Sequence, residues 1–253
     1  MGNTVISDKR QQLYLPGDKV KLRGIIKFVY KQSGKAILDY RMIEEGDKVL
    51  VAVSGGVDSL SMLKLLKMRQ KRLPIKFQLM ACFVDIDFID VDRSALVKFF
   101  KDIDVPYVIK ELSLDPDNTD CFWCSWNRRK ALFRTAREFN CTKIALGHNL
   151  DDISETTLMN MCFFAELSTM KPRLSFFNGE FQTIRPLCYL EKDKINEFAG
   201  KFVFPDTDYD CPKGKDTRRR LIRKILAEIK QDCPAVKKNL FNSLKNIKED
   251  YLV

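Results

Sequence analysis

The chain of 253 residues is long enough for one large α/β domain with appendages or for two small domains. Hydrophobic residues make up 45% of it, which excludes wholesale disorder, and no apolar stretch is long enough to span a bilayer. The formal net charge of +10 favours a polyanion such as nucleic acid over an acidic protein or a membrane, although a lysine-rich surface without a partner would give the same charge. The N-terminal stretch lacks the apolar core of a signal peptide, so we expect a cytoplasmic protein.

The predicted elements begin with an amphipathic helix between residues 19 and 40, where apolar residues recur at helical spacing. Short apolar strands then alternate with helices, a pattern typical of a parallel sheet that is covered on both faces. We expect strands at 48–53, 77–84, 107–109, 143–146 and 181–184, and helices at 60–70, 93–102, 127–139, 153–167, 192–202, 215–229 and 236–247.

This order of elements predicts an α/β fold with a doubly wound, mostly parallel, five-stranded sheet of the Rossmann-like type. We divide the chain into an N-terminal helical extension (1–40), an α/β domain (41–205) and a C-terminal cysteine loop with helices (206–253). Ligands of such sheets bind at the carboxyl ends of the strands, so the loops that follow the strands are the first candidates for a site.

A turn rich in serine and glycine, SGGVDS at 54–59, follows the first strand and opens the next helix. Backbone N–H groups are free at the start of a helix, and glycines let a phosphate approach them without obstruction by Cβ. The turn is too short for a Walker A loop and lacks its Gly-Lys-Ser/Thr ending. A tight turn with a capped helix would use the same residue types, but position and composition favour a phosphate site.

Three of the eight cysteines stand out by their context. Cys121 and Cys124 form a C-x-x-C pair before a predicted helix, and Cys211 lies in a later polar loop. A lone C-x-x-C pair suits a redox site, half of a zinc site or part of an iron–sulfur site. A thioredoxin-like pair should follow the first strand of its fold, and zinc would normally need a second pair. Three thiolates can hold an iron–sulfur cluster that keeps one iron open for a further ligand.

Three motifs, in this order, resemble those of the PP-loop ATP pyrophosphatases: SGGVDS, LGHNLDDISET at 146–156 and IRPL at 184–187. Enzymes of that superfamily have an adenine nucleotide alpha hydrolase-like fold, cleave ATP between the α and β phosphates and leave an adenylated substrate. The second and third motifs are similar to those of its tRNA-modifying branch. The three cysteines and the last segment, from Cys233 onward, resemble the iron–sulfur tRNA 2-thiocytidine synthetases.

The resemblance implies roles for individual residues. Cys121, Cys124 and Cys211 would hold a 4Fe-4S cluster, and Asp58, Asp151 and Asp152 would be the catalytic carboxylates that hold Mg²⁺ on ATP. Adjacent carboxylates at a helix start suit Mg²⁺ in their own right, although two acids that only cap the helix would look the same. The residues implied to bind the nucleotide are Ser54, Gly55, Gly56, Val57, Asp58, Ser59, Val84, Asp85, Gly147, His148 and Asp152.

Basic residues follow both cysteine loops, in WNRRKALFRTAREF and in KGKDTRRRLIRK. Two basic helix starts beside the cofactor loops would bind RNA phosphates and deliver an extruded base, whereas some of the arginines could only cover apolar surface with their stems. The RNA-binding residues that we expect are Arg128, Arg129, Lys130, Lys215, Arg218, Arg219 and Arg220.

The expected function is therefore that of an ATP-dependent tRNA sulfurtransferase, which adenylates the C2 carbonyl of a pyrimidine, foremost cytidine at position 32, and replaces its oxygen with sulfur. Its partners would be tRNA, a sulfur donor such as a cysteine desulfurase and a second copy of the chain, with no membrane. Two departures keep alternatives open, because Val57 stands where the subgroup usually has lysine and Asn149 where a second histidine is common. The alternatives are a cluster-free amidating ligase of the lysidine-forming type and a non-catalytic iron–sulfur or RNA-binding regulator.

Overall fold

The structure is a computed structural model that describes residues 14, 19–115, 120–207 and 217–251. Within these residues the chain forms a six-stranded sheet in the order β3–β2–β1–β4–β6–β5, in which only β5 runs antiparallel to its neighbour. The mostly parallel, Rossmann-like sheet expected from the sequence is confirmed, with one strand more than expected. The strands are β1 (Lys48–Val53), β2 (Gln78–Ile86), β3 (Tyr107–Leu112), β4 (Lys143–Ala145), β5 (Arg173–Phe176) and β6 (Phe181–Ile184).

The additional strand, β5, pairs with β6 through a turn over residues 177–180, in which Phe177, Asn178 and Gly179 all have positive φ. Asn and Gly tolerate this left-handed backbone better than other residues do. The strand has four residues and no clear alternation of buried and exposed side chains, so periodicity could not reveal it.

The helices occupy the positions that the sequence predicts, with shifted ends. The largest shift is in α4, which begins at Cys121 rather than near residue 127, because Asp120 caps it by accepting a hydrogen bond from the Trp123 backbone N–H at 2.6 Å. The cysteine pair therefore lies on the first turn of a helix and not on a loop. The helices are α1 (Gly24–Asp39), α2 (Val57–Gln70), α3 (Arg93–Asp102), α4 (Cys121–Glu138), α5 (Leu150–Phe164), α6 (Lys192–Ala199), α7 (Thr217–Asp232) and α8 (Val236–Ser243), with short 3₁₀ turns η1 (Phe177–Gly179) and η2 (Glu249–Tyr251).

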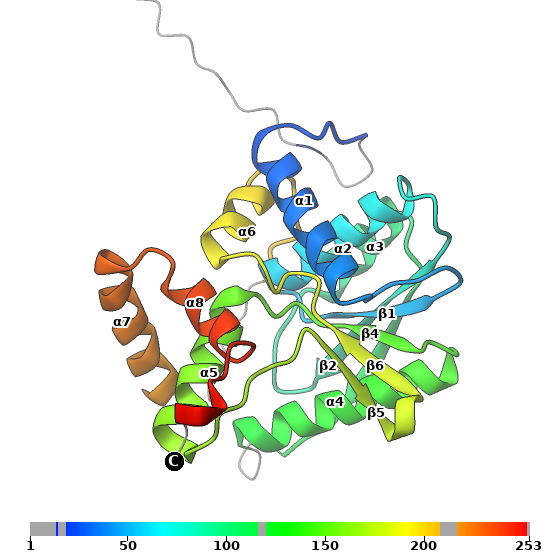
Figure 1. Cartoon of the computed structure of the whole chain (residues 1–253). Helices are drawn as coiled ribbons and strands as arrows, with labels where there is room; N and C mark the ends of the chain where they lie inside the picture. The colour runs from blue at the N-terminus through cyan, green and yellow to red at the C-terminus, as the bar shows by residue number, and fades with distance from the viewer. Residues whose placement is uncertain (1–13, 15–18, 116–119, 208–216, 252–253) are drawn as a thin grey trace, which may run out of the picture.

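Helices cover the two faces of the sheet unequally (Figure 1). One face carries the main core cluster, to which α1, α2, α3 and α6 contribute side chains such as Ile37, Leu63, Phe100 and Phe198. The other face packs against α4 through a smaller cluster that includes Leu132. Burial on both faces explains why β1 and β2 are almost continuously apolar.

The C-terminal helices α7 and α8 gather with α5 at one end of the molecule (Figure 1). Ile222, Leu226 and Val236 form a third apolar cluster there, while Phe241 of α8 joins the main core. Side chains from α1 and α8 thus pack into the same core as the sheet. The division of the chain into segments 1–40, 41–205 and 206–253 stays a prediction. None of the helices in the described ranges combines the length and apolar character that a bilayer crossing requires.

Candidate active site

The candidate site lies where the strand order reverses. The chain proceeds from β1 to β2 and β3 on one side of β1 and then returns to place β4 on its other side. The loops after β1 and β4 consequently leave neighbouring strands in different directions, and open α/β sheets bind ligands in the resulting gap. A cavity of about 540 Å³ occupies this position. Its lining consists of Ala52, Val53, Ser54, Asp58, Ser59, Cys82, Val84, Ser125, Arg128, Arg129, Leu132, Leu146, Gly147, His148, Asp152, Met170, Arg185 and Arg219.

The serine and glycine turn after β1 is held by hydrogen bonds among its own residues. The Ser59 hydroxyl donates to the carbonyl oxygen of Gly56 at 2.8 Å and accepts from the Ser54 backbone N–H at 3.1 Å. Gly56 is the N-cap of α2, so the free N–H groups at the start of this helix lie in the turn. Val57 begins α2 and packs partly buried against the main core.

Two glycines are required by close backbone contacts around this turn. Gly55 has φ of +90°, and a Cβ there would lie 3.3 Å from the carbonyl oxygen of Thr207, whose hydroxyl donates to the Gly55 carbonyl at 2.7 Å. A Cβ on Gly147, in the loop after β4, would lie 3.3 Å from the backbone nitrogen of Ser59. Gly147 therefore allows the loops after β1 and β4 to come together, and Gly55 allows the segment at Thr207 to pack against the phosphate turn.

Asp58 is the charged centre of the phosphate turn. Its Oδ2 accepts hydrogen bonds from Lys192 Nζ at 2.7 Å and from Asn149 Nδ2 at 3.4 Å, whereas its buried Oδ1 has no hydrogen-bond partner among the described residues. Burial raises the pKa of this carboxyl, and the hydrogen bond from Lys192 opposes that rise. An unpartnered carboxylate oxygen beside a cavity is a fitting ligand for a cation.

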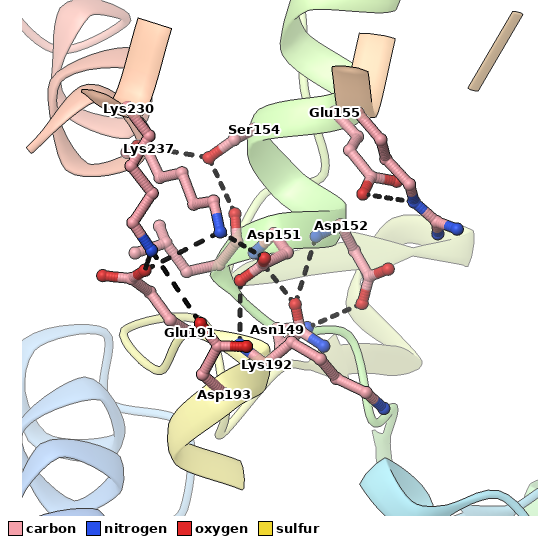
Figure 2. A network of polar contacts seen from close by, with 12 residues as sticks. Asn149, Asp151, Asp152, Ser154, Glu155, Glu191, Lys192, Asp193, Lys230 and Lys237 are labelled. Carbon is pink, nitrogen blue, oxygen red and sulfur yellow. Dashed lines mark hydrogen bonds and ion pairs between the residues drawn. The ribbon is translucent and has the colours of Figure 1, made fainter. Parts of the chain in front are cut away.

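Asn149 caps α5, and the carboxylates of Asp151 and Asp152 next to it contact different partners (Figure 2). Its Oδ1 accepts from the backbone N–H groups of Asp151 and Asp152, and Asp152 Oδ2 accepts in return from the Asn149 N–H at 3.0 Å. Asp152 lines the cavity. Asp151 does not line it, because its carboxylate pairs with Lys237 Nζ at 2.5 Å and accepts from the Lys192 N–H at 2.9 Å. The structure thus brings Asp152, but not Asp151, to the cavity with Asp58.

Asp151 belongs to an ion-pair network that joins the starts of α5 and α6 to α7 and α8 (Figure 2). Lys237 also lies 3.7 Å from the carboxylate of Glu191, which Lys230 of α7 approaches to 2.8 Å. These pairs are mostly shielded from solvent, and each charge has an opposite partner. The network therefore fixes the C-terminal helices to the starts of α5 and α6.

His148 lines the cavity and is held by Arg185, whose Nε donates to His148 Nδ1 at 3.2 Å. Because Nδ1 accepts this bond, the proton of the neutral ring is on Nε2. Burial, together with the charge of Arg185, lowers the pKa of His148 to about 4. The imidazole is neutral near pH 7, and its Nε2–H can donate a hydrogen bond. His148 is therefore suited to bind a ligand through this hydrogen bond and not through a positive charge.

The end of β2 contributes one of its two expected residues to the cavity. Val84 lines it, while Asp85 is buried beside it and its carboxylate pairs with Nε of Arg93 at the start of α3. Asp85 is thus engaged in an ion pair outside the cavity lining.

Cys121 and Cys124 lie one helical turn apart, the first exposed and the second half-buried. Residues three apart on a helix lie on one side of it, so both thiols can face one cofactor. Ser125 and Arg128, on the same helix, line the cavity, so the pair is close to its mouth along α4. Cys211 lies outside the described residues, and within them no group of three potential ligands for a metal ion is assembled.

The basic residues expected to bind RNA divide into several groups. Arg128, Arg129 and Arg219 line the cavity, and Arg219 and Arg223 lie 3.9 Å and 2.7 Å from the buried carboxylate of Glu155. Three other expected residues lie elsewhere in the described structure, and one lies outside it. Lys130 lies over the ring of Trp126, Arg218 over the ring of Phe163, Arg220 is exposed, and Lys215 is outside the described residues.

Sequence reasoning assigned no site role to Arg185, Lys192, Asn149 or Thr207. Arg185 is within the IRPL motif and Asn149 within LGHNLDDISET, so both motifs carried a signal. Lys192 and Thr207 contact the phosphate turn from more than a hundred residues along the chain, at separations of 134 and 152 residues, which no local pattern can reveal.

The low pKa of His148 predicts a pH-dependent stability that one substitution removes. Because the unfolded chain binds this proton with a pKa near 6.5, the stability is complete above about pH 6.5 and is lost as pH falls toward 4. Between about pH 7.5 and pH 5 the wild type should lose about 2 kcal/mol more unfolding free energy than His148→Gln. Urea unfolding at both pH values measures this, and His148 is the only histidine of the chain. Equal losses in the two proteins would contradict a buried neutral imidazole.

Comparison with known proteins agrees with the geometry. Residues 28–228 match the PP-loop domain family. The chain is 34% identical over 231 residues to the tRNA-cytidine(32) 2-sulfurtransferase of Geobacter sulfurreducens, covering 87% of this chain and 90% of the relative. It is 37% identical over 230 residues to the enzyme of the same name from Cupriavidus necator, covering 87% and 73% of the two chains.

A solved structure gives the same fold. The U34-tRNA thiolase NcsA from Methanococcus maripaludis, determined with its 4Fe-4S cluster, superposes with a TM-score of 0.75 at 24% identity, covering 91% of this chain and 80% of the other. The phosphate turn, the capped acids and the cavity between them are thus placed on a fold that a tRNA thiolase shares. The family match spans well over half of the chain, and the chain belongs to the PP-loop family.

Proposed function

We propose that this protein is an ATP-dependent tRNA sulfurtransferase that converts cytidine 32 of tRNA to 2-thiocytidine, as the names of its relatives state for them. The observation that carries the proposal is that one cavity is bordered by the phosphate turn, by the carboxylates of Asp58 and Asp152 and by α4, whose first turn bears the cysteine pair. The site therefore offers an ATP-binding side and a thiol-bearing side at a common opening.

The first step in this proposal is adenylation. The C2 carbonyl oxygen of cytidine attacks the α-phosphorus of ATP, the bond to the β-phosphate oxygen breaks, and pyrophosphate leaves. The free N–H groups at the start of α2 would bind the departing phosphates, with the Ser54 and Ser59 hydroxyls beside them. The guanidinium groups of Arg128, Arg129 and Arg185 line the same cavity and would balance the charge of the phosphates.

Mg²⁺ would be held by Asp58 and Asp152. Mg²⁺ is usually bound in nucleotide sites by one or two carboxylates together with phosphate oxygens, and this pair fits that need. Asp58 offers its unpartnered Oδ1, and both side chains line the cavity. Asp151 would not take part, since it is paired with Lys237.

The second step replaces the activated oxygen by sulfur. Sulfide adds to C2, the bond from C2 to the adenylated oxygen breaks, and AMP leaves with that oxygen, so no net oxidation or reduction takes place. A 4Fe-4S cluster held by Cys121, Cys124 and Cys211 would supply the sulfur at the mouth of the cavity. The buried Arg185 and the His148 that it holds would bind the AMP side of the substrate and exclude water from it. A cysteine desulfurase as sulfur source, a cytoplasmic location and a homodimer complete the proposal.

The test is the formation of 2-thiocytidine. The full chain, purified without oxygen and incubated with tRNA, ATP, Mg²⁺ and sulfide, should produce it, as measured by mass spectrometry of the tRNA nucleosides. Cys121→Ala and Cys124→Ala should abolish the product and lower iron and labile sulfide content, because each removes a cluster ligand. Cys162→Ala provides the matched control, since this exposed thiol is on α5 and does not border the cavity.

The outcomes separate the alternatives. AMP formation by the wild type without any thiolated product, at a rate that Cys121→Ala leaves unchanged, would indicate a cluster-free ligase that joins an amine to the same kind of adenylate. Binding of tRNA without any conversion of ATP to AMP would indicate a regulator. Either result would contradict the proposed sulfurtransferase.

Lys192 is the cation that we assign to the phosphate turn in place of the lysine that Val57 replaces. Its Nζ approaches Asp58 from α6, and it retains 39% exposure of its side chain, so it can reach a bound phosphate as well as the carboxylate. Charge on the turn would thus be supplied from another part of the chain.

Lys192→Met should raise the KM for ATP by about tenfold or more, because a hydrogen bond to a charged partner contributes about 1.5–3 kcal/mol. Steady-state release of pyrophosphate with varied ATP measures this effect. Lys194→Met is the matched control, because Lys194 is on the same helix and pairs with Glu197, at 2.9 Å, on the exposed surface. A KM that changes equally in both variants would contradict the assignment.

A further inference from the structure

We propose that Trp123 and Trp126 form a stacking surface for an unpaired base of the bound tRNA, next to the base that enters the cavity. The proposal deepens the proposed function, on which it rests, by assigning a contact with the RNA outside the cavity. Its occupant is single-stranded RNA.

The two indole rings are arranged for stacking. Their centroids lie 5.0 Å apart and their planes are inclined by only 9°, so they form a parallel stack on the surface of α4. Trp123 is 47% exposed, Trp126 is 41% exposed and the neighbouring Phe122 is 75% exposed. None of the three belongs to the core clusters formed by the described residues. Exposure of adjacent large aromatic rings is unfavourable in water and indicates a surface that a ligand covers.

The position of the rings relative to the cavity follows from the helix. Ser125, Arg129 and Leu132 are on the side of α4 that lines the cavity. With about 100° per residue, Trp126 lies about a third of a turn around the helix from that lining, and Trp123 lies nearly half a turn from it. A nucleotide chain that has one base in the cavity and continues around α4 therefore meets Trp126 first, with Trp123 stacked beyond it.

Basic side chains surround the two rings and indicate that the partner is negatively charged. The ammonium group of Lys130 lies 4.9 Å from the centroid of Trp126, and Arg129 and Arg134 are exposed on the same helix. Aromatic rings interleaved with basic residues are the arrangement by which proteins bind single-stranded nucleic acid, with bases on the rings and phosphates at the cations. A second copy of the chain that presented this same face would instead place the basic side chains of α4 opposite each other.

The chain contains two tryptophans in total, so its tryptophan fluorescence reports on this pair alone. The full chain with its cluster is titrated with an anticodon stem-loop RNA, and saturable quenching is expected because a base stacks on the indoles. The control probe is the same stem-loop with abasic nucleotides in the loop, which retains the phosphates and should bind with little quenching. Equal quenching by both probes would overturn the proposal, as would fluorescence of the free protein that changes on dilution, which would show that another copy covers the rings.

Affinity gives a second readout that does not depend on the indoles, namely anisotropy of labelled stem-loop RNA. The double variant Trp123→Ala/Trp126→Ala should bind about 5- to 100-fold more weakly, with the salt dependence unchanged, whereas Trp123→Phe/Trp126→Phe should retain most of the affinity. Lys130→Ala should make the salt dependence shallower by about one ion. Phe28→Ala removes an aromatic ring of similar exposure from α1 and should have no effect.

Failure of this inference is distinguishable from failure of the proposed function. Unchanged affinity in the double alanine variant, with 2-thiocytidine still formed by the wild type, would overturn only the stacking surface. Weakened affinity in that variant, with no thiolation by the wild type, would leave the stacking surface in place and contradict the proposed reaction.

Discussion

The close approach of two loops, after β1 and after β4, is the constraint on which the site depends. The strands are neighbours in the sheet, and the loops leave them in different directions, so a gap opens at their carboxyl ends. Beside the gap the two loops are so close that a Cβ on Gly147 would lie 3.3 Å from the Ser59 backbone, so a side chain there would force the loops to shift. The phosphate turn and the acids of α5 can then face one cavity although they lie about ninety residues apart, as the 91-residue separation of Asp58 and Asn149 shows.

Charge balance is the second constraint. Arginine side chains from α4, α7 and the loop after β6 line a cavity whose carboxylates come from Asp58 and Asp152. Burial lowers the pKa of Arg185 to about 10 and raises that of Asp58, so the site holds both kinds of charge at a cost in solvation. A bound polyphosphate with its cation would offset that cost, since it supplies opposite charge to each set. The ion pairs of Lys237 and Lys230 keep the C-terminal helices in place around this arrangement (Figure 2).

The sequence was sufficient for the parts of this architecture that are encoded locally. Continuous apolar runs predicted β1 and β2, and the SGGVDS turn marked the ligand side of the sheet. The predicted start of α4, near residue 127, is too late because the cap at Asp120 comes before a cysteine pair of the kind that is typical of loops. The contacts of Asp58 with Lys192, and the diversion of Asp151 to Lys237, depend on tertiary packing and have no local signature.

The central claim is that the C2 carbonyl of the pyrimidine is activated by transfer of AMP to its oxygen, within the cavity between the two loops. The most direct measurement follows that oxygen. Transfer RNA with oxygen-18 at the C2 carbonyl of cytidine 32 is converted by the full chain with ATP, Mg²⁺ and sulfide, and the AMP is analysed by mass spectrometry. The account predicts that the label appears in the phosphate of AMP in proportion to the 2-thiocytidine formed. Thiolated tRNA with unlabelled AMP would contradict it, because the oxygen would then have left C2 without ever being bound to phosphorus.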